Sequence, residues 1–298
     1  MSERFATALY VLAWCFLPRL PESWARGLFR FIADIAWRRQ GAGVQRLEAN
    51  LRRVEPYADG KRLRALSRAG MRSYLRYWLE VFQLPSYDQE HITGRMTVEN
   101  FGAVRAHLDA GRGVLLALPH MGNWDLAGAW VAAQGVPFTT VAERLRPEAL
   151  YETFVEYRES LGMEVLPLTG GGAAAGKLAR RLRSGGLVCL VADRDITESG
   201  AQVKFFGEPA SMAAGPAALA LQTGAALLPV TLWFTEEGCT ARVHDEVLAP
   251  FGGDRADRIA DMTQGMADAF AAGIAAHPED WHMLQRIFLT DPAPDGPR

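Results

Sequence analysis

Apolar residues along the chain follow two kinds of pattern. Short runs rich in apolar and β-branched residues predict strands, and longer stretches with apolar residues every three or four positions predict helices. The first pattern predicts strands over residues 96–99, 113–118, 138–142, 165–168, 187–192, 226–234 and 240–247. The second predicts helices over residues 61–84, 102–110, 126–134, 147–161, 173–183, 213–223 and 258–276. This alternation indicates an α/β fold with a mixed, partly parallel central sheet covered by helices on both faces.

The amino-terminal part of the chain differs from the rest in charge. Residues 1–76 contain fifteen Lys and Arg against six Asp and Glu, a surplus of nine positive charges. Because the whole chain carries a net charge of −2, the remainder carries −11. Residues 24–39 place apolar and aromatic side chains at helical spacing with arginines between them. We expect an amphipathic helix on an anionic membrane surface rather than on nucleic acid; a helix packed on the core with a solvated arginine face is the alternative.

Residues 6–17 form the most apolar window near the start of the chain. This window has about a dozen residues, fewer than the roughly 20 that a helix needs to cross a bilayer. Pro18 and Arg19 end it, and no small-residue cleavage site follows it. We therefore expect an anchor that lies in the membrane interface. The predicted organisation is a basic helical region over 1–85, an α/β core over 86–290 and a loose tail over 291–298.

The composition excludes several classes of protein. Apolar residues make up 49% and charged residues 22% of the 298 positions, which is typical of a globular protein. Cys15, Cys189 and Cys239 are too far apart to suggest a disulfide framework or a metal knuckle, and no His-x-x-x-His pair occurs. Residues 171–177 match the start of a phosphate-binding loop, but Leu178 stands where that motif needs Ser or Thr. We expect no metal site and no nucleotide hydrolysis.

The strongest candidate for chemistry is His120, which follows the apolar run at 113–118. Ligands of open α/β sheets bind at the carboxyl ends of the strands, where this strand would place the imidazole. Asp125 follows five residues later, and a turn into a helix would let its carboxylate fold back onto the ring. Such an acid fixes the tautomer and leaves the other ring nitrogen free to accept a proton. The alternative is an ordinary strand-end histidine with Asp125 as a helix cap.

The sequence contains no Gly-x-Ser-x-Gly and no His-Glu-x-x-His motif. A His–Asp pair without a nucleophile fits the attack of a substrate hydroxyl on an acyl group that is already activated, such as a thioester. His120 would take the hydroxyl proton while backbone amides or a nearby cation hold the oxyanion. No covalent acyl-enzyme is needed.

The segment at 119–125 resembles the His-x4-Asp motif of the glycerolipid and lipid A acyltransferases. Across most of the chain the pattern is similar to the bacterial lipid A acyltransferase family, and within it to the phosphatidylinositol mannoside acyltransferases. The closer resemblance rests on an ordered set of segments: 119–125 (PHMGNWD), 143–145 (ERL), 157–165 (YRESLGMEV), 191–195 (VADRD), 205–207 (FFG) and 212–216 (MAAGP).

The resemblance implies roles for particular residues. His120 would be the base, Asp125 its motif partner, and a second acid downstream would assist the histidine. The candidates for this second acid are Asp193, Asp195 and Glu198, and the choice among them stays open. The remaining residues that the resemblance assigns to substrate binding are Asn123, Trp124, Glu143, Arg158, Arg194 and Asp195. A surface ion pair for Glu143 and Arg158, and a capped turn for residues 193–195, are the structural alternatives.

The resemblance also implies the substrates and the setting. The donor would be acyl-CoA, used as a co-substrate with no further cofactor, and the acceptor a mannose hydroxyl of a mannosylated phosphatidylinositol. The acyl group would be palmitoyl-like, and the protein a peripheral monomer on the cytoplasmic face of the inner or plasma membrane. Two alternatives remain: acylation of a lipid A-like glycolipid from acyl-CoA or acyl carrier protein, and a lipid-binding protein without catalysis.

Overall fold

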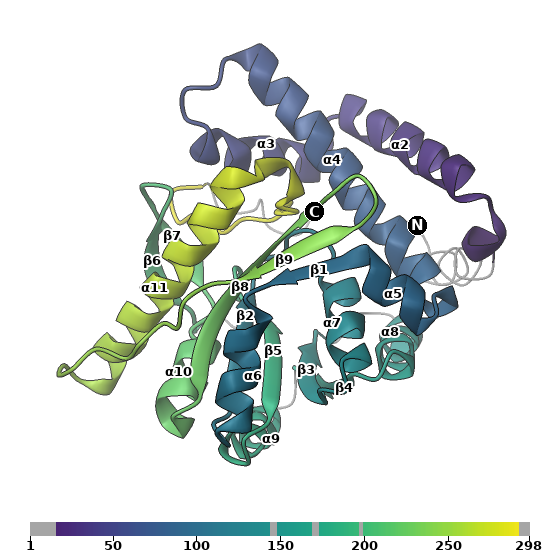
Figure 1. The fold of residues 1–298 in the computed structure, drawn as a ribbon. Helices are drawn as coiled ribbons and strands as arrows, with labels where there is room; N and C mark the ends of the chain where they lie inside the picture. Colours follow the sequence, from purple (N-terminus) through teal and green to yellow (C-terminus); the bar gives the residue numbers. More distant parts are fainter. Residues whose placement is uncertain (1–15, 144–147, 169–172, 197–198, 292–298) are drawn as a thin grey trace.

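A seven-stranded sheet forms the centre of the molecule (Figure 1). The computed structural model describes residues 16–143, 148–168, 173–196 and 199–291. The strand order is β1-β9-β8-β2-β5-β3-β4, and every neighbouring pair is parallel except β8 and β9. The strands are β1 (Met96–Glu99), β2 (Val114–Leu118), β3 (Phe138–Ala142), β4 (Glu164–Pro167), β5 (Leu187–Val191), β8 (Ala226–Phe234) and β9 (Cys239–Val243). The predicted fold class is confirmed.

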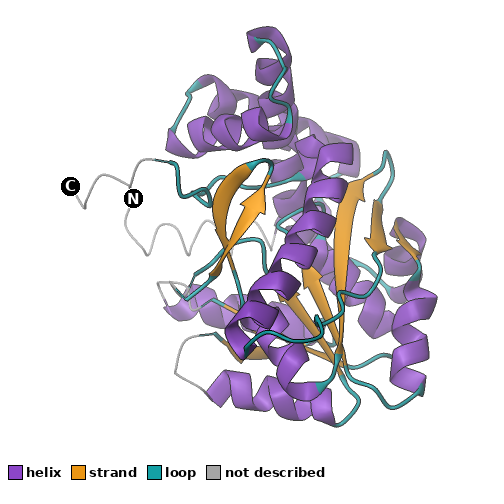
Figure 2. Ribbon diagram, turned by 90° about the vertical axis from the view of Figure 1, so that its left-hand side faces the viewer, coloured by secondary structure: helices purple, strands orange, loops and turns teal. Residues whose placement is uncertain are grey.

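Helices cover both faces of the sheet (Figure 2). They are α2 (Glu22–Arg38), α3 (Ala42–Val54), α4 (Gly60–Gln83), α5 (Gln89–Arg95), α6 (Phe101–Asp109), α7 (Trp124–Ala133), α8 (Glu148–Ser160), α9 (Ala173–Arg183), α10 (Gly215–Thr223) and α11 (Arg255–Ala276). Three 3₁₀ turns are η1 (Leu17–Arg19), η2 (Leu84–Ser86) and η3 (Pro278–Asp280). An antiparallel hairpin of β6 (Ala201–Phe205) and β7 (Glu208–Met212) lies apart from the main sheet.

The two sides of β2 show how the core is divided. Successive side chains of a strand point to opposite faces. Leu116 and Leu118 therefore join the apolar cluster that contains residues of α6 and α7. Leu115 and Ala117 join the second cluster, with residues of α9, α10, α11 and the β6–β7 hairpin. Because both faces are covered, β2 is apolar throughout, as is typical of a central parallel strand.

The helices α2, α3 and α4 form a layer beside the carboxyl ends of the central strands (Figure 1). Asp59 caps α4 by accepting a hydrogen bond from the backbone N–H of Arg62. One side of α4 packs on α2 and α3, and its last turns enter the core next to the sheet. Asp34 of α2 accepts hydrogen bonds from Arg68 and Arg72 of α4, which fixes the two helices together.

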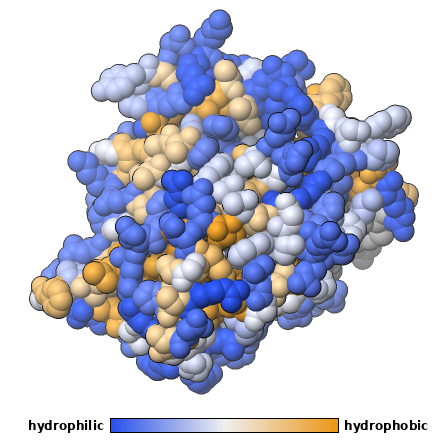
Figure 3. Space-filling view, in the orientation of Figure 1, coloured by the Kyte–Doolittle hydropathy of each residue, from blue (hydrophilic) through white to orange (hydrophobic). Residues whose placement is uncertain are grey.

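One side of α2 is not covered by the described residues. Trp24, Leu28, Phe31 and Ile32 are exposed, with Trp24 at 75%. Their spacing of four, three and one residues places them on a single face of the helix. In the space-filling view, hydrophilic surface over the α2–α4 layer is interrupted by hydrophobic patches (Figure 3). No helix among the described residues is long and apolar enough to cross a membrane. Most of the window at 6–17 lies outside the described residues.

The sequence patterns did not predict α3, α5 or the β6–β7 hairpin. The predicted strand at 240–247 is wrong in its second half, since β9 ends at Val243. Beyond that point His244 and Val247 still donate backbone hydrogen bonds to β8, but the regular ladder stops. Residues 244–247 therefore continue along β8 without forming a strand.

Candidate active site

His120 and Asp193 meet because β2 and β5 are parallel neighbours. In their register, Leu118 lies opposite Val191, the last residue of each strand. Two residues further along each chain segment come His120 and Asp193. Nδ1 of the imidazole lies 2.5 Å from Oδ1 of the carboxylate. The backbone N–H of His120 donates to Oδ2 at 3.0 Å, so both carboxylate oxygens of Asp193 bind the histidine.

Asp193 is fully buried, whereas the side chain of His120 is 27% exposed. Oδ2 of Asp193 also accepts a hydrogen bond from Nε1 of Trp281 at 3.0 Å. Burial alone would raise the pKa of the Asp193 carboxyl, but the charge of His120 and the hydrogen bonds from His120 and Trp281 hold that pKa below its usual range. A carboxylate on Nδ1 fixes the tautomer in which Nε2 is the acceptor. Among the described residues, none donates a hydrogen bond to Nε2.

The turn from His120 into α7 depends on Gly122. Its φ of +58° is unfavourable for a residue with a Cβ, and a Cβ there would lie 2.9 Å from Cβ of Leu232. Asn123 then caps α7, because its Oδ1 accepts from the backbone N–H of Leu126 at 2.9 Å. The sharp turn places the first helical residues directly beside the imidazole.

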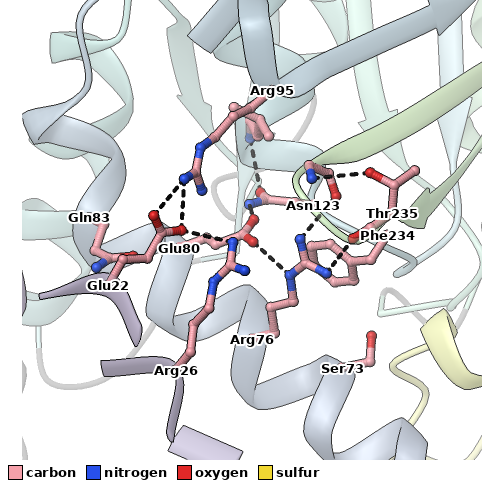
Figure 4. A network of polar contacts seen from close by, with 12 residues as sticks. Glu22, Arg26, Ser73, Arg76, Glu80, Gln83, Arg95, Asn123, Phe234 and Thr235 are labelled. Carbon is pink, nitrogen blue, oxygen red and sulfur yellow. Dashed lines mark hydrogen bonds and ion pairs between the residues drawn. The ribbon is translucent and has the colours of Figure 1, made fainter. Parts of the chain in front are cut away.

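Asn123 is itself held by a chain of polar contacts from α4 (Figure 4). Its Nδ2 donates to Glu80 at 2.8 Å, and the other oxygen of Glu80 accepts from Arg76 at 2.8 Å. Arg76 also donates to the backbone carbonyls of Thr235 and Gly238, in the turn between β8 and β9. Both polar ends of the Asn123 amide thus have partners inside the protein. Its expected contact with substrate stays a prediction.

The expectation that Asp125 folds back onto His120 is wrong. Its carboxylate accepts from Nε of Arg158 at 2.7 Å and from the hydroxyl of Tyr77 at 2.8 Å. Asp125 lies in the first turn of α7, which turns its side chain away from the imidazole toward α4 and α8. Burial disfavours the charged Arg158, but the charge and hydrogen bonds of Asp125 outweigh it and raise the pKa of the guanidinium. This buried pair fixes α8 against α7.

Trp124 joins His120 to this second cluster. Its indole stacks on Tyr77 with ring centroids 4.1 Å apart, and it meets the His120 ring edge to face at 5.5 Å. Trp124, Asp125 and Arg158 line one part of a cavity between α7 and the sheet. The rest of the lining is largely apolar and comes mostly from several strands of the sheet, including Leu116, Leu118, Phe138, Cys189, Val230 and Val243.

The other predicted residues follow β3 and β5. Glu143 accepts from Arg194 at 2.9 Å and Arg158 pairs with Asp125, so the alternative of an ion pair between Glu143 and Arg158 is wrong. Asp195 accepts from the backbone N–H of Gly200 at 2.8 Å and from Ser211 at 3.3 Å, which closes the loop after β5. Of the candidate second acids that the structure describes, Asp193 is the one on the imidazole. Glu198 lies outside the described residues.

The structure also bears on metal binding. Within residues 16–143, 148–168, 173–196 and 199–291, no group of three or more His, Cys, Asp or Glu side chains could hold a metal ion. Both described cysteines, Cys189 and Cys239, are free, and burial raises the pKa of each thiol. The two thiols are therefore protonated at neutral pH and poor nucleophiles.

Comparison with known proteins places the chain in a family. The family model of the bacterial lipid A biosynthesis acyltransferases matches residues 1–290. The chain belongs to this family. It is 49% identical over 285 residues to the phosphatidylinositol mannoside acyltransferase of Mycolicibacterium smegmatis, covering 95% of this chain and 91% of the relative. It is 45% identical over 289 residues to the enzyme of the same name from Mycobacterium tuberculosis H37Rv, covering 95% and 88%.

Membership in this family makes the chain an O-acyltransferase. Among the residues that contact the candidate site, Tyr77 and Trp281 are absent from the sequence-based prediction. Tyr77 lies on the predicted helix 61–84, but nothing in the sequence distinguishes it from other aromatic residues. Trp281 is an isolated aromatic residue after η3, and no motif marks it. Both were missed because their roles depend on contacts between distant segments.

Proposed function

We propose that this acyltransferase transfers a long, palmitoyl-like acyl chain from acyl-CoA to a mannose hydroxyl of a phosphatidylinositol mannoside. The observation that carries the chemistry is the hydrogen bond between Nδ1 of His120 and the buried Asp193. The acceptor class is supported by relatives that are 45–49% identical over most of the chain. The protein works without a further cofactor, as a peripheral monomer.

His120 acts as the general base. Its Nε2 takes the proton of the mannose hydroxyl as the hydroxyl oxygen attacks the thioester carbonyl carbon. Asp193 stabilises the imidazolium that forms. The tetrahedral intermediate then collapses with cleavage of the C–S bond, and the imidazolium returns the proton to the departing CoA sulfur. A general base of this kind contributes roughly 10²–10⁴ in rate.

No covalent acyl-enzyme forms in this scheme. The described contacts of the His120 side chain are Asp193 and the Trp124 ring, and neither is a nucleophile toward a thioester. The two described cysteines are buried and carry raised pKa values. Direct transfer between two bound substrates is therefore the route that the site supports.

The cavity beneath α7 takes the acyl chain of the donor. Its apolar lining suits a hydrocarbon chain, because burying methylene groups there removes them from water at about 0.8 kcal/mol each. Trp124 belongs both to the lining and to the surroundings of His120, so the thioester end would lie beside the imidazole. The partly exposed Glu143–Arg194 pair supplies polar groups for the remaining parts of the substrates.

The exposed apolar face of α2 holds the enzyme on an anionic membrane surface. Trp24, Leu28 and Phe31 would enter the headgroup boundary, with arginines of the basic amino-terminal region against the lipid phosphates. This location on the cytoplasmic leaflet brings the lipid acceptor to the site in two dimensions.

The test is an assay of the purified full chain with radiolabelled palmitoyl-CoA. Three parallel reactions contain mannosylated phosphatidylinositol, a lipid A-like glucosamine lipid, or no acceptor. We expect label on the mannosylated lipid alone. Label on the glucosamine lipid alone would assign the lipid A-type activity instead. No transfer to either lipid by folded protein would contradict the proposal and favour a lipid-binding protein without catalysis.

A further inference from the structure

The segment 280–282, more than 150 residues after His120, runs alongside the turn that carries the histidine. Met121 and Trp281 form an antiparallel bridge. On one side of it the backbone N–H of His282 donates to the carbonyl of His120 at 2.7 Å, and on the other the N–H of Gly122 donates to the carbonyl of Asp280 at 3.0 Å. The backbone before and after Met121 is therefore fixed by the same distant segment.

The side chain of Trp281 continues this contact to Asp193. Both residues are completely buried, and the indole Nε1–H donates to Oδ2 at 3.0 Å. Oδ2 thus accepts from the indole and from the His120 backbone, while Oδ1 faces the imidazole. With two donors on Oδ2, the carboxylate is held in the rotation that points Oδ1 at Nδ1. A buried carboxylate also needs such donors to remain ionised.

The β6–β7 hairpin fixes the orientation of the indole. The rings of Phe205 and Phe206 lie 5.9 and 6.1 Å from Trp281 between centroids. Phe206 sits at the turn of the hairpin with a φ of +47°, which is strained for a bulky residue. Packing of the aromatic rings holds this conformation in place. The hairpin therefore closes one side of the space in which Trp281 reaches Asp193.

From these contacts we infer that Trp281 is a positioning residue for catalysis: its indole N–H orients and stabilises the Asp193 carboxylate, and Asp193 in turn orients His120. The inference rests on the proposed role of His120 as the base. It assigns a function to a completely buried tryptophan that acts through Asp193. Removing the N–H takes a hydrogen bond from the negatively charged Asp193 carboxylate. The pair formed by His120 and Asp193 then binds its proton more tightly.

The variant that tests the inference is Trp281→Phe, which removes the N–H and keeps an aromatic ring. Trp233→Phe is the matched control, because Trp233 stacks on His277 and donates no hydrogen bond to Asp193. For Trp281→Phe we expect the acidic limb of the kcat/KM profile to move up by about one pH unit, the effect of losing a hydrogen bond to a charged group. At pH values below the midpoint of that limb, kcat/KM then falls about tenfold, and it recovers at higher pH. The control profile stays in place.

A second measurement needs no substrate. In full-length protein with ¹⁵N-labelled histidine, the pH midpoint of the His120 imidazole signals should move up in Trp281→Phe and not in Trp233→Phe. This shift would appear even if the mannoside were not the acceptor, so the two proposals fail separately. An unchanged midpoint and an unchanged acidic limb would overturn the inference, because a merely structural role lowers activity equally at every pH.

The wild-type protein provides the readout if Trp281→Phe does not fold. With ¹⁵N-labelled tryptophan, the indole N–H signal of Trp281 should shift with pH at the same midpoint as the His120 imidazole. A Trp281 signal that does not respond to this titration contradicts the inference.

Discussion

The imidazole of His120 binds Asp193, which lies 73 residues further along the chain, with 2.5 Å between Nδ1 and Oδ1. Asp125, only five residues from the histidine, binds Arg158 instead. The two aspartates therefore have separable functions. In the proposed mechanism Asp193 acts on the protonation and orientation of the base, whereas Asp125 packs α7 against α8.

Replacing each aspartate by asparagine separates these functions. Asp193→Asn puts an amide where the imidazole needs an anionic acceptor, and we expect kcat to fall by about 10²–10⁴. Asp125→Asn leaves the acceptor on His120 in place, so kcat falls much less while the free energy of unfolding decreases. Steady-state kinetics and urea unfolding of the two variants check this. A folded Asp193→Asn enzyme that works as fast as the wild type would show that Asp193 is not the functional partner.

Removing Arg158 should be costly for stability. Asp125 is 2% exposed, and Arg158→Ala leaves its carboxylate buried without its counter-charge. We expect a loss of about 3–5 kcal/mol in the free energy of unfolding. Arg158→Ala combined with Asp125→Ala should lose less than the sum of the single changes, because no unpaired charge is left.

The matched control for this pair is Arg242→Ala. Arg242 pairs with Glu99, but both side chains are partly exposed, at 51% and 39%. An exposed pair contributes about 0–1 kcal/mol. Equal losses for Arg158→Ala and Arg242→Ala in urea unfolding would contradict a structural role for the buried pair.

Asp280 predicts a pH dependence of stability. Burial raises the pKa of its carboxyl to about 6, despite hydrogen bonds from Ser73 and from the backbone N–H of Phe234. The folded state then holds this proton more tightly than the unfolded state, whose pKa is 3.8. The contribution of Asp280 is therefore fully present below about pH 4 and is lost as the pH rises through about 6.

The comparison that isolates this effect is wild type against Asp280→Asn, which does not titrate. The difference in the free energy of unfolding between wild type and Asp280→Asn should change by up to about 3 kcal/mol between pH 4 and 7. The wild type loses stability relative to the variant as the pH rises. Denaturant unfolding at several pH values measures it. A constant difference would mean that Asp280 has an ordinary pKa in the folded protein.

Gly128 provides a test of the acyl-chain cavity. It lines the cavity from α7, and an added Cβ would lie 2.7 Å from the terminal methyl of Met163 and 3.2 Å from the Phe138 ring. Gly128→Leu should therefore lower kcat/KM for palmitoyl-CoA more than for an octanoyl donor. Gly102→Leu is the control, since a Cβ there meets nothing within 4 Å. An equal effect on both donors would place the acyl chain elsewhere.

The sequence was informative about the strands of the core. It was less informative about which strands are neighbours and which side chains bind one another. Apolar runs located the strands that end before His120 and Asp193, because a central parallel strand leaves no polar position. The choice of Asp193 over Asp195 required knowing that β2 and β5 are neighbours in register, which follows from strand order and not from local pattern. The hairpin at 201–212 was missed although Val203, Phe205, Ala210 and Met212 alternate with polar or small residues.

Proximity in sequence was misleading for Asp125. A spacing of five residues suggested contact with His120, but the turn at Gly122 and the cap at Asn123 start α7 between them. The helix then sets the direction of the Asp125 side chain toward Tyr77 and Arg158. Trp281 shows the opposite case, since it is distant in sequence and close in space, and no local pattern distinguishes it.

The most direct test of the account is the turnover of His120→Ala with radiolabelled palmitoyl-CoA and mannosylated phosphatidylinositol. We predict that acyl transfer falls by at least about 10²-fold, while the unfolding transition and binding to anionic vesicles match the wild type. Turnover close to that of the wild type would contradict the assignment of His120 as the base on which the mechanism depends.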